Sequence, residues 1–219
     1  MHPPFRPAAV LFDCDGVLAD SEGAVNMIVA ADLTARGWAL TAAECQETFL
    51  GMDANTMVPV IEGRVGKLPE NWLTLISHRI AVAMLATLQP IPGALAAVRA
   101  VAAAGIPVAV ASNSGREELA AKLRRLGLEK TFAGHCFSFQ DVARPKPAPD
   151  IYLAAARACG AEPGQCVVVE DSLLGAQAGL AAGCRVLGLT RETDASVFRG
   201  IGATPFDSME ALPRLLGLG

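Results

Sequence analysis

Apolar runs that alternate with alanine-rich helical patterns are the feature that most constrains how this chain can fold. From Leu95 onward, runs rich in β-branched residues alternate with helical segments, an order typical of a parallel α/β sheet. The runs are apolar almost throughout, which favours strands that are buried on both faces. The expected strands are 8–13, 106–111, 136–139, 166–170 and 185–189. The predicted fold class is therefore α/β, with a doubly wound, Rossmann-like parallel sheet.

Helices are expected between these strands, at 93–104, 116–126, 149–159 and 173–182. One glycine follows each helix: Gly105, Gly127, Gly160 and Gly183. Glycine readily adopts the left-handed conformation that commonly ends a helix. We therefore interpret these glycines as helix C-terminal caps.

The segment 21–89 interrupts the alternation. It contains several helical patterns and no convincing strand, so we expect an inserted helical domain. The sequence QPIPGA at 89–94 has two prolines and a glycine, which suits a return linker, and the outgoing linker would follow Asp20. The expected domains are a Rossmann-like core over 1–20 and 90–219 and a helical domain over 21–89. Two adjacent linkers would permit a hinge.

Charge and composition narrow the class of partner. The 219 residues include 18 basic and 22 acidic side chains, with a net charge of −4 and no block of lysine or arginine, which argues against nucleic acid. The N-terminus lacks a signal pattern, and apolar runs such as 106–111 are far shorter than the ~20 residues that span a bilayer. Six cysteines without a CxxC pair suggest reduced thiols. We expect a cytoplasmic protein, a monomer or weak dimer, without a membrane or nucleic-acid partner.

Polar residues follow the first two expected strands at the point where each ends. In a doubly wound sheet, ligands bind outside the carboxyl ends of the strands. Asp13 and Asp15 follow the first strand, and Ser112, Asn113 and Ser114 follow the second, at the start of a helix. Hydroxyl and backbone N–H groups at such a position either cap the helix or bind an anion, and both interpretations stay open for this motif alone.

A second acidic pair, Glu170 and Asp171, follows the apolar strand at 166–170. Together with Asp13 and Asp15, up to four negative charges would share one crevice, which requires a cation or protonation. Oxygen ligands without histidine favour Mg²⁺ over zinc or copper. A single acidic pair is commonly just solvated, whereas two pairs at corresponding strand ends favour a metal site.

Lys146 lies between two prolines in the sequence ARPKPAPD, at 143–150, just before a helix. The prolines restrict the backbone on both sides of the lysine. An exposed lysine is the plain alternative. A lysine held rigidly in this crevice would instead offset the carboxylates and bind a phosphoryl oxygen.

Four sequence motifs occur here in an order that resembles the haloacid dehalogenase superfamily. The motifs are DxDGxxxD at 13–20, SNS at 112–114, RPKPAPD at 144–150 and EDS at 170–172. They are similar to the phosphatase and β-phosphoglucomutase-like branch, in which a helical cap is inserted after the first motif. The resemblance extends from Ala8 to about Thr190. An aspartate two positions after the first argues against the dehalogenases themselves.

The resemblance implies a role for each acid of the site. Asp13 would be the nucleophile that attacks phosphorus, and Asp15 would be the general acid for the leaving alcohol and then the general base for water. Mg²⁺ would be held by the Asp13 carboxylate, the Asp15 backbone carbonyl and Asp171. Glu170 would bind the metal either directly or through water.

The same resemblance implies which other groups bind the phosphoryl oxygens. Ser112 and Lys146 would act in catalysis and, with Asn113, would bind the phosphoryl group of the substrate. In the cap, the segment 49–57 resembles the substrate-specificity loop and would contribute Gly51.

A cap helix offers His78 and Arg79, each of which either faces the substrate or lies on a solvated helix face. Arg79 is the one that we take as a substrate ligand. Arg64 and Lys67 are further cationic candidates without support from their positions.

The predicted function is a Mg²⁺-dependent phosphatase that hydrolyses a small phosphorylated metabolite, a sugar or polyol phosphate, through an aspartyl phosphate. The alternative is a β-phosphoglucomutase-like enzyme. Mutases have a histidine near the cap hinge, where this chain has Val25, and a basic residue in the cap loop, where it has Ala54 or a neighbour. A receiver-type signalling domain needs no cap and presents its acidic pair before the phosphorylated aspartate. A non-catalytic binding protein on this fold is the remaining alternative.

Overall fold

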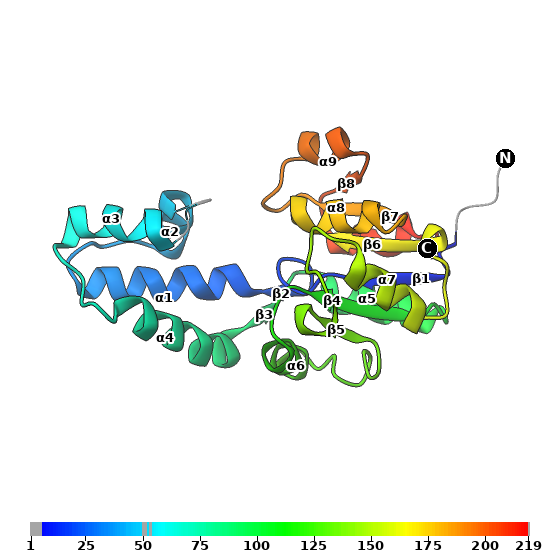
Figure 1. Ribbon diagram of the computed structural model, residues 1–219, viewed down its shortest axis with the longest axis horizontal. Helices are drawn as coiled ribbons and strands as arrows, with labels where there is room; N and C mark the ends of the chain where they lie inside the picture. The colour runs from blue at the N-terminus through cyan, green and yellow to red at the C-terminus, as the bar shows by residue number, and fades with distance from the viewer. Residues whose placement is uncertain (1–5, 50–51, 53, 219) are drawn as a thin grey trace. The chain divides into compact units, whose positions relative to one another are not determined.

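The computed structural model describes residues 6–49, 52 and 54–218 and divides into two compact units. The core unit comprises Met1–Asp20 and Gln89–Gly219, and the helical unit comprises Ser21–Leu88 (Figure 1). The chain leaves the core unit through β2 (Ala19–Asp20) and returns through β3 (Gln89–Pro90). These two strands pair antiparallel, with Asp20 opposite Gln89. Gln89, which we expected in the helical insertion, therefore belongs to the core unit.

A six-stranded sheet forms the centre of the core unit, with every strand pair parallel and the order β5-β4-β1-β6-β7-β8. The strands are β1 (Ala9–Phe12), β4 (Val108–Ser112), β5 (Cys136–Ser138), β6 (Cys166–Glu170), β7 (Arg185–Leu189) and β8 (Thr204–Phe206). This confirms the predicted α/β class. From β1 the chain builds one side of the sheet through β4 and β5, then returns to build the other side from β6 onward. The order therefore reverses next to β1, where ligands of such sheets bind.

Helices cover both faces of the sheet. The core-unit helices are α5 (Ala94–Ala103), α6 (Arg116–Arg125), α7 (Asp150–Ala158), α8 (Leu173–Ala181), α9 (Ala195–Ile201) and α10 (Leu212–Leu215). Helices α7, α8 and α9 pack on one face, where Tyr152 and Phe198 lie in one buried cluster with Leu11 and Val168. Successive strand residues point to opposite faces, so Phe12 points to the other face and contacts the ring of Phe132.

Most expected boundaries lie within two residues of the observed ones. The four glycines expected to end helices follow α5, α6, α7 and α8 with positive φ. Strand β4 begins at Val108 rather than at residue 106, because Pro107 has no N–H for a sheet hydrogen bond. Strand β8 was not predicted, because it has three residues and one is Pro205.

The helical unit consists of α1 (Ser21–Ala35), α2 (Ala42–Phe49), α3 (Ala54–Val65) and α4 (Trp72–Thr87). Its buried cluster includes Leu33, Ile61 and Trp72. Beside this cluster, Asp32 accepts hydrogen bonds from Trp72 Nε1 at 2.8 Å, Arg36 Nε at 2.7 Å and Arg79 Nη1 at 2.5 Å. One carboxylate therefore joins α1 to α4. Among the described residues, every helix is too short or too polar to cross a lipid bilayer.

Candidate active site

Two strands that lie side by side bring the two acidic pairs together. In the pairing of β1 with β6, Phe12 lies opposite Val169, so the next residues, Asp13 and Glu170, are neighbours at the carboxyl edge of the sheet. Oxygen atoms of Asp13, Glu170 and Asp171 all lie within 4.8 Å of one another, and the three side chains are buried. Strand register therefore creates the concentrated negative charge that the sequence predicted.

Lys146 provides positive charge inside this acidic group. Its buried Nζ contacts Asp13 Oδ1, and it donates hydrogen bonds to Glu170 Oε1 at 2.6 Å and to the Ala111 carbonyl at 2.9 Å. An ammonium group has three N–H donors, so these three acceptors use all of them. The lysine is thus fixed between the ends of β1, β4 and β6.

Glu170 accepts hydrogen bonds on both of its carboxylate oxygens. Oε1 accepts from Lys146 and from the Tyr152 hydroxyl at 2.8 Å. Oε2 accepts from the backbone N–H groups of Asp171 and Ser172, at 3.2 and 3.1 Å, and from the Ser172 hydroxyl at 2.9 Å. A carboxylate has about four lone-pair positions, so these five contacts occupy it fully.

Two glycines allow backbone to approach the acids closely. Gly16 has a φ of +76°, and a Cβ at this residue would lie 1.7 Å from Asp171 Oδ2. A Cβ at Gly175, in the first turn of α8, would lie 1.7 Å from Glu170 Oε1. Any larger residue at either position would displace a carboxylate of the site.

The charge of the acidic group is not balanced by Lys146 alone. Burial raises the pKa of Asp13 to about 7, with Lys146 opposing this rise and Glu170 and Asp15 adding to it. Burial also raises the pKa of Asp171 to about 9, and Asp13 and Glu170 contribute to the increase. A divalent cation would relieve this repulsion. Three buried carboxylates without histidine or cysteine form an oxygen-only donor set, which fits a hard divalent cation.

Asp15 lies in a separate cluster, with α6 and the residues after β4. Its Oδ1 accepts a hydrogen bond from Lys122 Nζ at 2.6 Å. Its Oδ2 accepts from the hydroxyl of Ser114 at 2.9 Å and from that of Ser112 at 3.3 Å. Sequence reasoning missed Lys122. The available signal was its position three residues after Leu119 and one before Leu123, on the buried side of α6, where a charged residue is unusual.

Asn113 connects the SNS motif to the loop that contains Lys146. Its side-chain amide donates to the Lys146 carbonyl at 3.2 Å, and its side-chain oxygen accepts from the Lys146 backbone N–H at 3.1 Å. The Ser112 hydroxyl accepts from the Ser114 backbone N–H at 2.9 Å. The core motifs predicted from sequence therefore converge at one edge of the sheet.

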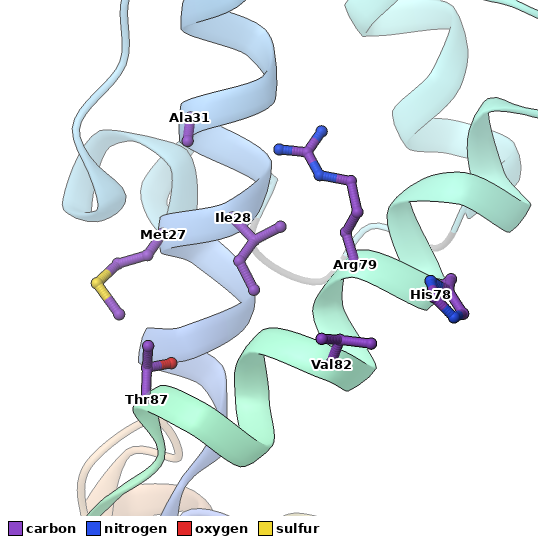
Figure 2. Close-up of a pocket in the computed structure, with 7 residues that line it drawn as sticks. All are labelled: Met27, Ile28, Ala31, His78, Arg79, Val82 and Thr87. Atoms are coloured by element: carbon purple, nitrogen blue, oxygen red, sulfur yellow. The ribbon is translucent and has the colours of Figure 1, made fainter.

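The predicted cap residues are less informative. Gly51 lies outside the described residues. Arg79 extends from α4 toward α1, where it pairs with Asp32 and lines a hollow of about 450 Å³ within the helical unit, and His78 projects away from α1 (Figure 2). The hollow also includes Ile28 and Val82. Arg79 therefore has a structural partner inside its own unit.

Comparisons with known proteins agree with this geometry. A family model described as haloacid dehalogenase-like hydrolase matches residues 7–183. A 6-phosphogluconate phosphatase from Escherichia coli (strain K12) is 29% identical over 212 residues, which cover 96% of this chain and 95% of that protein. A bifunctional riboflavin kinase/FMN phosphatase from Arabidopsis thaliana is 30% identical over 186 residues, which cover 82% of this chain and 48% of that protein. Among solved structures, a HAD family hydrolase from Deinococcus radiodurans R1 with bound phosphate and sodium has 34% sequence identity to this chain. The two structures superpose with a TM-score of 0.83, and the match covers 98% of this chain and 97% of the other.

Proposed function

This chain belongs to the haloacid dehalogenase-like hydrolase family, and from that membership we propose that it is a Mg²⁺-dependent phosphatase acting on a small phosphate monoester. The observation that carries the proposal is the contact of Lys146 with both Asp13 and Glu170 at the carboxyl ends of neighbouring strands. Phosphoryl transfer requires a nucleophile, a cation and metal-binding oxygens close to one another.

We propose that the Asp13 and Asp171 carboxylates and the Asp15 backbone carbonyl hold Mg²⁺. Glu170 would contribute through water, because its own oxygens already accept five hydrogen bonds. When bound, Mg²⁺ supplies positive charge that offsets the negative charge of the phosphoryl oxygens.

The reaction proceeds in two displacements at phosphorus. In the first, an oxygen of Asp13 bonds to phosphorus, the bond to the leaving alcohol breaks, and Asp15 gives its proton to the leaving oxygen. In the second, Asp15 takes a proton from water as the water oxygen bonds to phosphorus and the bond to Asp13 breaks. In both steps the positive charge of Lys146 offsets the negative charge of the equatorial oxygens, and the Ser112 hydroxyl stabilises them as a donor.

The proposed substrate is a phosphorylated sugar or polyol. Two relatives are named for acting on 6-phosphogluconate and on FMN. Both compounds are phosphate esters of a primary alcohol at the end of an open polyhydroxylated chain. We propose this chemical class for the present chain, with the helical unit as the cap that covers the bound substrate and excludes bulk water.

A screen of phosphate monoesters with Mg²⁺ tests the function, with released phosphate and isomerised product measured together. The compounds include open-chain polyol phosphates, ring-form sugar phosphates and p-nitrophenyl phosphate. We expect phosphate release to be fastest from the open-chain esters and to be abolished in Asp13→Asn. Isomerised product without phosphate would instead indicate a mutase, and phosphate release by Asp13→Asn would contradict the proposed nucleophile.

A further inference from the structure

Lys122 is a buried cation in the core unit that the reaction described above does not use. Its side chain is 2% exposed, and its Nζ donates to Asp15 Oδ1 at 2.6 Å, to the Ser114 hydroxyl at 2.9 Å and to Glu118 Oε1 at 2.5 Å. Three acceptors thus use its three donors. The contact with Asp15 joins residues that are 107 positions apart in the chain.

Packing alone does not account for a lysine at this position. Lys122 shares the buried side of α6 with Leu119 and Leu123, where an uncharged side chain of similar length, such as methionine, would fill the same space. Burying an ammonium group is unfavourable unless its partners compensate for the lost hydration. One of those partners is Asp15, the proposed proton donor, which suggests that the contact itself has a role.

The contacts make the two oxygens of Asp15 unequal. Oδ1 points to Lys122 inside the core unit, whereas Oδ2 lies beside the hydroxyls of Ser112 and Ser114. Ser112 is the last residue of β4, at the edge of the sheet where Asp13 and Lys146 meet. Oδ2 is therefore the oxygen on the side of the reacting phosphoryl group, and Oδ1 is the oxygen by which the carboxyl group is anchored.

We propose that Lys122 is a positioning residue, which holds Asp15 by Oδ1 so that Oδ2 gives a proton to the leaving alcohol and later takes one from water. This inference rests on the proposed phosphatase function and adds a residue to it. Lys122 itself touches neither substrate nor phosphorus. Its loss should therefore affect the steps in which Asp15 transfers a proton and spare those in which no proton is needed.

Two substrates with different leaving groups distinguish the steps that need a proton from those that do not. An alkyl phosphate needs a proton on its leaving oxygen, whereas p-nitrophenolate leaves without one. In Lys122→Met we expect kcat for the best alkyl phosphate of the screen to fall about 100-fold, with KM changed by less than about threefold. The first turnover of p-nitrophenyl phosphate should stay within about threefold of wild type. Because water activation also needs Asp15, that first turnover should appear as a burst, and phosphorylated Asp13 should accumulate.

Lys130→Met is the matched control, because it removes the same charge from an exposed position of the same unit. It should leave both substrates at wild-type rates. Should Lys122→Met fail to fold, Ser114→Ala provides the test, since the Ser114 hydroxyl contacts both Lys122 and Asp15 Oδ2. We expect about a tenfold loss with the alkyl phosphate and the same burst with the aryl phosphate.

A first turnover of p-nitrophenyl phosphate that is slowed as much as turnover of the alkyl phosphate, or no loss with the alkyl phosphate, would overturn the positioning role of Lys122. Either result would leave the phosphatase proposal standing, provided that the wild-type protein releases phosphate and Asp13→Asn does not. Conversely, a wild-type protein that releases no phosphate from any ester would refute the proposed function before any Lys122 variant is measured.

Discussion

The side chain of Asn113 is hydrogen-bonded twice to the main chain of Lys146, once as donor and once as acceptor. This pairing fixes the Lys146 loop against the end of β4. Asn113→Ala removes both bonds, and we expect kcat to fall roughly tenfold because the Lys146 ammonium loses its exact placement beside Asp13. In Asn113→Asp, which keeps the acceptor oxygen, kcat should fall less than in Asn113→Ala. Steady-state kinetics of the two variants check this order, and wild-type kcat in Asn113→Ala would contradict it.

Asp13→Asn should abolish turnover, because an amide cannot form the aspartyl phosphate and is a weaker metal ligand. Asp15→Asn should behave differently. This variant keeps its backbone carbonyl but loses the side chain that acts as general acid and then as general base. Each of these two roles typically raises the rate by about 10²–10⁴-fold. With p-nitrophenyl phosphate, Asp15→Asn should become phosphorylated on Asp13 and stall. Mass spectrometry after acid quench locates the adduct; an adduct on Ser112 or Ser114 would rule out Asp13 as the nucleophile.

Removal of the metal by a chelator should abolish phosphate release, and Mg²⁺ should restore it. Calcium should substitute poorly, because its longer and more flexible coordination moves the nucleophile out of line. The buried carboxylates repel one another, so Mg²⁺ should also raise the Tm of the wild-type protein, and this rise should be smaller in Asp171→Asn. Thermal unfolding with and without Mg²⁺ measures this separately from catalysis. Full turnover in chelator would exclude the metal requirement.

Gly16→Ala should weaken the metal site through Asp171. A Cβ at Gly16 would overlap the Asp171 carboxylate, and the carboxylate must move. We expect the Mg²⁺ concentration needed for half-maximal activity to rise by at least about tenfold. Gly105→Ala is the matched control: its φ of +72° imposes similar backbone strain, but a Cβ there has no neighbour within 4 Å. An equal Mg²⁺ requirement in the two variants would show that strain, and not Asp171, is responsible.

Asp32 should make the stability of the protein depend on pH in the acid range. Burial opposes its ionisation, but hydrogen bonds from Arg36, Trp72 and Arg79 outweigh burial and hold the pKa of Asp32 below its usual range. A lowered pKa in the folded state gives a stabilisation that is complete above the unfolded-state pKa and is lost as pH falls through the folded-state value. Asp32→Asn should therefore cost roughly 1–3 kcal/mol near neutral pH. The Tm difference from wild type should shrink below about pH 4; a constant difference would show that the charge of Asp32 is unimportant.

Part of this site could be predicted from sequence because its chemistry is local. Strand β6 is an uninterrupted apolar run that ends in two acids, and a parallel sheet brings such ends to one edge. Lys122 could not be predicted as a partner of Asp15, because that contact depends on how α6 docks and how far a long side chain reaches. The same holds for Asn113, whose two bonds to the Lys146 main chain depend on the path of a loop. Within the helical unit, the partner of Arg79 was equally hidden, since Asp32 lies 47 residues earlier.

The pairing of Asp20 with Gln89 means that the helical unit enters and leaves the core at a single point. An insertion whose two ends are adjacent can be lengthened, shortened or exchanged without any change in the length of the strands on either side. The core motifs all lie outside the insertion: the motif with Asp13 precedes it in the sequence, and the motifs up to the one with Asp171 follow it. With the helical unit as the proposed cap, substitutions or insertions within it would change substrate choice, while the proposed reacting groups, which all lie in the core unit, keep their places.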